Sequence, residues 1–193
     1  YSPHLRFIIY NGSCGSLHES VWSHSLFYVH LVQIKVMNIF YIDNDPKKAA
    51  QQLADDHIRK MQIESAQMCS VAHWENGSSA PYKKSHTNHP STKWVRASIH
   101  QYRWVIEHSL EICAEFEKRY GKRHKTQDVL EWLRDNEPQI PDVGFIAPPQ
   151  CMPDNFKQQD TVQAYRTFYI QDKVKVKQLK WNKLNNQPTW INE

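Results

Sequence analysis

The sequence predicts an all-α protein, a compact helical domain with two long helices, a proline-rich crossing loop and a short N-terminal extended segment. Two long stretches carry apolar residues at three- and four-residue intervals, which is the period of an α-helix. Residues that start and stop helices flank these stretches. Only 5 of the 193 residues are glycine, which argues against a turn-dense all-β fold and against a glycine-rich nucleotide loop.

The first helix is expected to run from Pro46 to about His73, with Asp45 as N-cap and Pro46 in the first helical position. Its predicted buried face consists of Ala50, Leu53, His57, Met61, Glu64 and Met68. His57 and Glu64 would lie two turns apart on this face, roughly 10 Å along the axis. A carboxylate on a buried face must be paired, neutralised or functional. Glu64 is therefore either a candidate catalytic residue or a core residue hydrogen-bonded to a neighbouring helix.

The second helix is expected from about Pro90 to Tyr120, where Gly121 supplies a stop signal. Its apolar stripe consists of Val95, Ser98, Ile99, Tyr102, Val105, Ile106, Ser109, Ile112, Cys113 and Phe116. A short third helix, capped by Thr126, is expected to reach about Asn136.

The region after the third helix contains five prolines within residues 137–157, which predicts an extended crossing loop. Asp160 is a suitable cap for a last helix, in which Val162, Tyr165, Phe168 and Tyr169 would face inward. Alternating lysines then lead to a tail that ends near Trp190.

Residues 1–36 differ in composition from the rest, because they contain only three charged residues, Arg6, Glu19 and Lys35. We expect a single helical domain over residues 37–193, with Met37 as the natural start and residues 1–36 as upstream read-through or a disordered extension. No apolar run approaches the roughly 18–20 residues of a membrane span. The four widely spaced cysteines suggest reduced thiols, as in the cytoplasm.

A basic segment in the middle of the chain is a candidate DNA-binding surface. Basic side chains neutralise phosphates, and aromatic rings can stack on exposed bases. The candidate contacts are Lys83, Lys84, His86, Asn88, His89, Lys93, Trp94 and Arg96. The alternative is an ordinary solvated face with tryptophans in the core.

A histidine-rich region suggests two other kinds of chemistry. Cys69-x3-His73 and His86-x2-His89 contain ligand types that zinc uses, but they lack the closely spaced ligand pairs of common structural zinc sites. We therefore expect neither a metal nor a cofactor. A cluster of His73, His86 and His89 could instead serve an enzyme that acts on nucleotides or modified bases.

Amine chemistry is a further possibility near Glu64. An α-amino group titrates near 7.7–8.0, against about 10.4 for lysine, so a chain that starts at Met37 would carry a ready nucleophile. Lys60, one turn before Glu64, is the alternative amine. An amine that attacks a sugar C1′ beside a carboxylate would constitute a glycosylase and lyase site.

The segment Leu53-Ala54-Asp55-x-His57-x6-Glu64 resembles the signature of the phage pyrimidine-dimer DNA glycosylases, the endonuclease V family. Residues 110–119 are similar to the family's central helix, and Pro188-Thr189-Trp190 to its aromatic tail. The chain is also similar to a group of small phage and bacterial proteins that begin Met-Asn-Ile-Phe. The elements shared with that group are Asp45-Pro46, residues 60–67 and Asn88-His89-Pro90.

The resemblance implies base removal and abasic-site cleavage on damaged or modified duplex DNA. It assigns Glu64 as the catalytic carboxylate, His57 as a residue of the lesion pocket and the terminal amine as the group that forms an imine. Ile63 and Ser65 stand where the family has arginines, and Asn38 follows Met37 where the family has a small residue. The missing arginines weaken the expectation of a pyrimidine dimer as substrate. The remaining alternative is a phage accessory protein that binds nucleic acid without catalysis.

Overall fold

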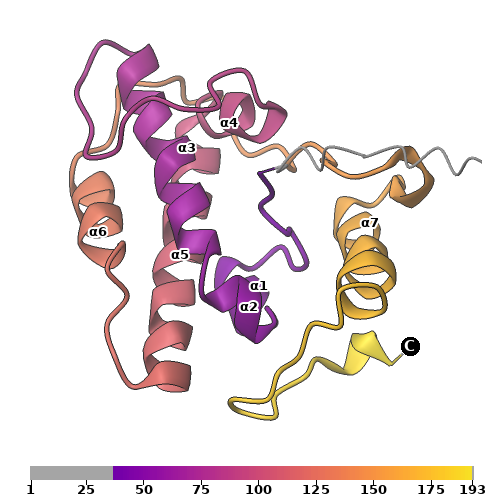
Figure 1. The fold of residues 1–193 in the computed structure, drawn as a ribbon. Helices are drawn as coiled ribbons and strands as arrows, with labels where there is room; N and C mark the ends of the chain where they lie inside the picture. The colour runs from indigo at the N-terminus through magenta and orange to yellow at the C-terminus, as the bar shows by residue number, and fades with distance from the viewer. Residues whose placement is uncertain (1–36, 193) are drawn as a thin grey trace, which may run out of the picture. The chain divides into compact units, whose positions relative to one another are not determined.

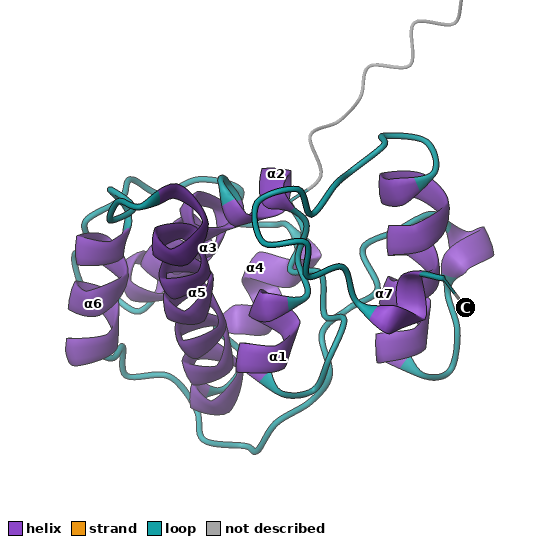
Figure 2. Cartoon of the chain, turned by 90° about the horizontal axis from the view of Figure 1, so that it is seen from below, coloured by secondary structure: helices purple, strands orange, loops and turns teal. Residues whose placement is uncertain are grey.

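The computed structural model describes residues 37–192, and the predicted extension at residues 1–36 lies outside them. The helices are α1 (Pro46–Gln51), α2 (Asp55–Ile58), α3 (Met61–Glu75), α4 (Pro90–Val95), α5 (Ile99–Tyr120), α6 (Gln127–Asp135) and α7 (Thr161–Phe168). Two short 3₁₀-helices, η1 (Asp154–Phe156) and η3 (Thr189–Ile191), and one π-helix, η2 (Tyr169–Val174), complete the set. All regular elements in the described residues are helical (Figure 2), so the all-α fold class is confirmed.

Helix α5 is the element around which the others pack, and it contacts α1, α2, α3, α4 and α6. Figure 1 shows α3 and α5 side by side, with α6 next to them. The predicted apolar stripe of α5 is buried throughout, from Ile99 to Phe116. No helix in the described part of the chain is long and apolar enough to cross a membrane.

The single first helix predicted from Pro46 to His73 is wrong, because the chain forms α1, α2 and α3 there. Arg119, which is distant in the sequence, stabilises the break after α1. The Arg119 guanidinium donates to the carbonyl oxygens of Leu53 at 2.8 Å and Gln51 at 3.1 Å. The Asp55 N–H donates to the Lys180 carbonyl at 2.9 Å. Tertiary partners thus satisfy backbone groups that a continuous helix would pair internally.

The second predicted helix is also divided, into α4 and α5, although its end at Tyr120 is confirmed. Ser98 is extended (φ −154°) and its hydroxyl accepts the His100 N–H at 3.4 Å, so it caps α5. The Ile99 N–H donates to the Pro141 carbonyl at 2.8 Å, which fixes the break. Gly121 ends α5 in the left-handed region (φ 65°), where a residue without a Cβ is favoured.

Two of the predicted caps are confirmed and one is not. Asp45 accepts the Lys47 N–H at 2.9 Å, and Asp160 accepts the Gln163 N–H at 2.9 Å. Thr126 precedes α6 as expected, but its side chain makes no capping hydrogen bond.

The C-terminal part returns to the break between α1 and α2. Tyr165, Phe168 and Tyr169 are buried as expected, while Val162 is half-buried. The Trp190 indole N–H donates to Gln52 Oε1 at 2.8 Å, which ties the tail to this region.

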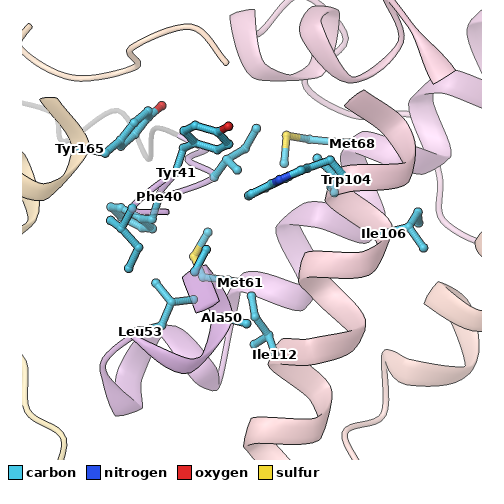
Figure 3. Packing of buried hydrophobic residues seen from close by; sticks show 14 of the residues in the cluster. Phe40, Tyr41, Ala50, Leu53, Met61, Met68, Trp104, Ile106, Ile112 and Tyr165 are labelled. Atoms are coloured by element: carbon cyan, nitrogen blue, oxygen red, sulfur yellow. The ribbon is translucent and has the colours of Figure 1, made fainter. Parts of the chain in front are cut away.

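Residues 37–42 are buried although they form no helix. Figure 3 shows Phe40 and Tyr41 of this segment near side chains from several helices, among them Tyr165 and Met68. The segment therefore crosses the core, which brings Asn38 into contact with α3 and with the crossing loop.

Candidate active site

Glu64 lies in the first turn of α3 and is half-buried. Its Oε2 accepts the backbone N–H of Asn38 at 3.3 Å. His57 does not share a helix with Glu64, because it belongs to α2. The predicted helix that carried both residues on one face is therefore replaced by two helices.

Asn38 is the residue that organises this site, and it is only 5% exposed. Its side-chain amide donates to the Cys151 carbonyl at 3.0 Å, and its Oδ1 accepts the Phe40 N–H at 2.9 Å. The amide side chain thus fixes the backbone whose N–H meets Glu64. Sequence reasoning missed Asn38 and Cys151 as site residues, although Asn38 belongs to the Met-Asn-Ile-Phe element.

A chain of hydrogen bonds connects this site to the basic segment of residues 83–96, which includes α4 and is hereafter called the basic loop. The Ser91 hydroxyl lies 3.3 Å from the Cys151 sulfur, and the Ser91 N–H donates to His89 Nδ1 at 3.2 Å. His89 in turn occupies the N-cap position of α4. Glu64 and the loop that contains Asn88 and His89 are thereby linked through Asn38 and Cys151.

His57 is a buried residue with its own partners. Its ring stacks on Phe40 with the centroids 4.3 Å apart, and its Nδ1 lies 2.7 Å from the Tyr169 hydroxyl. Burial, and then the charges of Lys60, Lys173 and Lys177, hold the pKa of His57 well below its usual value. The ring is therefore neutral near pH 7.

The basic loop is held in place by one carboxylate. Glu75 pairs with Lys84 and, at 3.9 Å, with Arg96. Arg96 also donates to the Thr87 carbonyl at 2.8 Å. Lys84 and Arg96 therefore already have protein partners, which reduces what they can offer to a phosphate.

The other predicted contacts in this region are exposed, buried or, for His89, half-buried. The exposed ones are Lys83, His86, Asn88 and Lys93. Trp94 is only 7% exposed and its indole N–H donates to the Ile146 carbonyl at 2.8 Å. The Trp94 ring is therefore part of the core and does not offer a face on which a base could stack.

The His73 ring forms its hydrogen bonds with residues outside the basic loop. Its Nε2 is 3.1 Å from the Tyr102 hydroxyl and its Nδ1 is 3.3 Å from the Ser78 hydroxyl. Burial lowers the pKa of His73 and raises that of the fully buried Cys69 thiol. Within residues 37–192, no group of three or more His, Cys, Asp or Glu side chains is arranged to hold a metal ion.

The two predicted amines are placed differently. Lys60 is exposed, at the N-cap position of α3. Met37 is 3% exposed and directly precedes Asn38. In the 193-residue chain the Met37 nitrogen is part of the peptide bond to Val36.

Comparison with protein families confirms the resemblance seen in the sequence. Residues 37–128 match the pyrimidine dimer DNA glycosylase family. The matched region starts at Met37 and ends inside α6, so it contains Asn38, His57, Glu64 and the basic loop. Searches of curated proteins and of solved structures returned no match to the chain.

Proposed function

We propose that this protein is a DNA glycosylase with abasic-site lyase activity, which acts on damaged or modified bases in duplex DNA. The observation that carries the proposal is the 3.3 Å contact between the Asn38 backbone nitrogen and Glu64 Oε2. Consecutive Cα atoms are about 3.8 Å apart. An amine at residue 37 would therefore be only one residue along the chain from the backbone nitrogen that contacts the carboxylate. The family match over residues 37–128 supports a DNA substrate.

The proposed mechanism gives Glu64 an electrostatic role. As the bond between C1′ and the base breaks, positive charge develops on the sugar. A carboxylate held in a partly buried site stabilises that charge more strongly than it would in water. The base leaves with the electrons of that bond and takes up a proton. The amine bonds to C1′, the C1′–O4′ bond of the sugar opens with a proton going to O4′, and a protonated imine remains. Loss of a proton from C2′ then expels the 3′ phosphate and cleaves the strand, and hydrolysis of the imine frees the amine.

The proposed amine is the α-amino group of a chain that begins at Met37, with Lys60 as the alternative. The start of the family match at residue 37 supports the first choice. Base removal also requires that the target nucleotide, or the nucleotide paired with it, leaves the base stack of the duplex. Lys83, Lys93 and the other exposed residues of the basic loop would hold the flanking phosphates.

Replacing Glu64 by Gln tests this function, because it keeps the shape and removes the charge. We expect duplex binding within a few-fold of the parent and strand cleavage at abasic or damaged sites lower by at least about a hundredfold. Glu107→Gln, an exposed position on α5, is the matched control and should cleave like the parent. Cleavage is measured on end-labelled duplexes and binding by fluorescence anisotropy.

Borohydride trapping tests the amine. A chain produced with Met37 as its first residue should give a reduced covalent complex with abasic duplex DNA, and the crosslinked peptide should contain residue 37. Absence of a crosslink on every abasic or damaged duplex, from this chain and from the 193-residue chain, would show that the lyase assignment is wrong. If Glu64→Gln only unfolds the protein and no activity is found, the acid is a structural residue and a non-catalytic DNA-binding role takes over.

A further inference from the structure

The crossing loop exposes an apolar turn at residues 143–146, hereafter the apolar tip. Val143 and Ile146 are 66% and 62% exposed, and Phe145 between them is 42% exposed. Residues 143–153 carry no charged side chain. An isolated exposed apolar residue is ordinary, whereas neighbouring ones indicate a surface that another molecule covers.

The backbone of the apolar tip is held in place although its side chains are exposed. The Val143 N–H donates to the Ser98 hydroxyl at 3.4 Å, and the Trp94 indole N–H donates to the Ile146 carbonyl at 2.8 Å. Gly144 lies between these anchors with φ 80°, in the left-handed region where a residue without a Cβ is favoured. The turn is therefore preformed, which reduces the entropy that its side chains lose when they bind a partner.

The apolar tip is attached to the basic loop. Trp94, which holds the Ile146 carbonyl, belongs to α4 and directly follows the exposed Lys93. The carboxylate next to the tip, that of Asp142, has a partner, because its Oδ1 lies 2.8 Å from His100 Nε2. A polyanion that binds the basic loop would therefore find the apolar tip beside it. Figure 1 shows the crossing loop running past α4 toward α7.

The crossing loop also connects the apolar tip to the candidate acid. The Phe145 ring lies 6.3 Å from the ring of Tyr41, in the buried segment 37–42. Further along the same loop, the Cys151 carbonyl accepts the side-chain amide of Asn38, the residue whose backbone N–H meets Glu64. The loop thus contacts one segment at two points, near the apolar tip and beside Glu64.

We propose that the apolar tip enters the base stack of duplex DNA next to the target nucleotide and holds that base step open. Apolar side chains, isoleucine among them, wedge between base steps and kink the duplex in other DNA-binding proteins. The adjoining basic loop and the match to a DNA glycosylase family favour a duplex over a second copy of this chain as the molecule that covers the tip. The inference rests on the proposed function and names the surface that moves the nucleotide.

The energetics of base extrusion give the inference a specific signature. Removing a nucleotide from the stack costs free energy, and the cost is smallest where the base is mismatched or already unpaired. Val143 and Ile146 would offset the cost by replacing lost stacking contacts with apolar contacts. The tip should therefore matter on a fully paired duplex and matter little where the pairing is already broken.

The first test measures unstacking without chemistry. The 193-residue chain is titrated into a duplex that contains a tetrahydrofuran abasic analogue, which cannot form an imine, beside 2-aminopurine, whose fluorescence rises when it leaves the stack. We expect the parent to raise the fluorescence and the double variant Val143→Ser, Ile146→Ser to reduce this rise at least about fivefold. Its affinity for the duplex should stay within a few-fold of the parent, because the cations remain.

The matched control removes exposed apolar side chains elsewhere. Val176 and Leu184, which are 70% and 44% exposed, lie in the C-terminal part of the chain. The double variant Val176→Ser, Leu184→Ser should unstack the duplex like the parent. Circular dichroism melting of both double variants shows that they are folded, which is expected because the altered side chains are exposed.

The second test measures strand cleavage at a natural abasic site in two contexts. On a fully paired duplex the Val143→Ser, Ile146→Ser variant should cleave at least about tenfold more slowly than the parent. Within a bubble of mismatches it should cleave nearly as fast as the parent. Equal losses in the two contexts would indicate a structural effect and overturn the role of the tip.

The remaining outcomes separate this inference from the proposed function. A variant that unstacks the paired duplex like the parent would overturn the role of the tip and leave the glycosylase assignment in place. A parent that unstacks the duplex but cleaves no abasic or damaged site would support the tip and overturn the lyase assignment. If the parent is a dimer in sedimentation, the variant is a monomer and neither changes the fluorescence, the tip is an interface between copies and the inference is wrong.

Discussion

At the scale of single residues, buried histidines make the fold sensitive to acid. His108 is 1% exposed, stacks on Trp104 with the centroids 4.9 Å apart, and both its ring nitrogens lack a hydrogen-bond partner among the described residues. Burial lowers the pKa of His108 to about 3. The unfolded chain, in which a histidine has a pKa near 6.5, therefore binds a proton that the folded chain does not. We therefore expect the stabilising contribution of neutral His108 to be complete well above pH 6.5 and to be lost as the pH falls from there toward 3.

Replacing His108 by Leu, which has a similar volume, should reduce this acid sensitivity. We expect stability at pH 7 to rise by about 1 kcal/mol, because an unpaired polar group leaves the core. Between pH 7 and pH 5 the variant should lose roughly 2 kcal/mol less than the parent. Urea unfolding at both pH values measures this, with His100→Gln, an exposed histidine, as control. If His108→Leu and the parent lose the same free energy of unfolding between pH 7 and pH 5, His108 is not the source of the acid sensitivity.

At the scale of elements, one arginine of α5 determines where the first helical region breaks. The Arg119 side chain is 0% exposed and pairs with Asp55 at 3.0 Å and with Glu115 at 3.5 Å. It also donates to the carbonyls of Gln51 and Leu53. Helix propensity predicts a continuous helix there, and this guanidinium supplies the partners that allow the chain to turn instead.

Arg119→Met should be strongly destabilising. It removes one of the two cationic partners of the buried Glu115 carboxylate and leaves only Lys118. It also removes the guanidinium that donates to two backbone carbonyls. Breaking a buried ion pair of this kind costs about 3–5 kcal/mol. Arg103→Met on the same helix removes a bidentate pair with Glu137 at the surface and should change stability little. Thermal unfolding followed by circular dichroism compares the two. Equal melting temperatures would contradict the role assigned to Arg119.

At the scale of the whole molecule, the formal net charge of +4 is modest. DNA binding therefore depends on the positions of basic side chains that are not already paired with a carboxylate. Lys84 and Arg96 pair with Glu75, whereas the exposed Lys83 and Lys93 form no ion pair within the described residues. We expect affinity for duplex DNA to fall steeply with salt. Each lost phosphate contact should reduce the log–log slope by about 0.9.

The double variant Lys83→Gln, Lys93→Gln should therefore flatten the slope by nearly twice that amount, and Lys84→Gln by less. Lys122→Gln with Lys125→Gln, at the turn between α5 and α6, makes the same change in charge elsewhere. Anisotropy titrations over a range of salt concentrations measure the slopes. If both double variants give the same slope, the basic loop is an ordinary solvated surface.

The features that sequence analysis predicted correctly are those that depend on near neighbours in the chain. The caps at Asp45 and Asp160, the stop at Gly121 and the buried stripe of α5 each involve residues within one or two helical turns. The spacing from His57 to Glu64 also led to the glycosylase resemblance, and the family match over residues 37–128 confirms it.

The arrangement of the candidate site depends on contacts between residues that are distant in the sequence. Asn38 meets Glu64 across 26 positions and Cys151 across 113. Helical periodicity carries no information about such pairs, because it describes one element at a time. The sequence by itself therefore indicated which stretches of the chain are helical, the caps at Asp45 and Asp160 and the stop at Gly121. Only the tertiary structure decided where the long helices break and which groups surround the carboxylate, because most buried polar groups must find a partner wherever the fold supplies one.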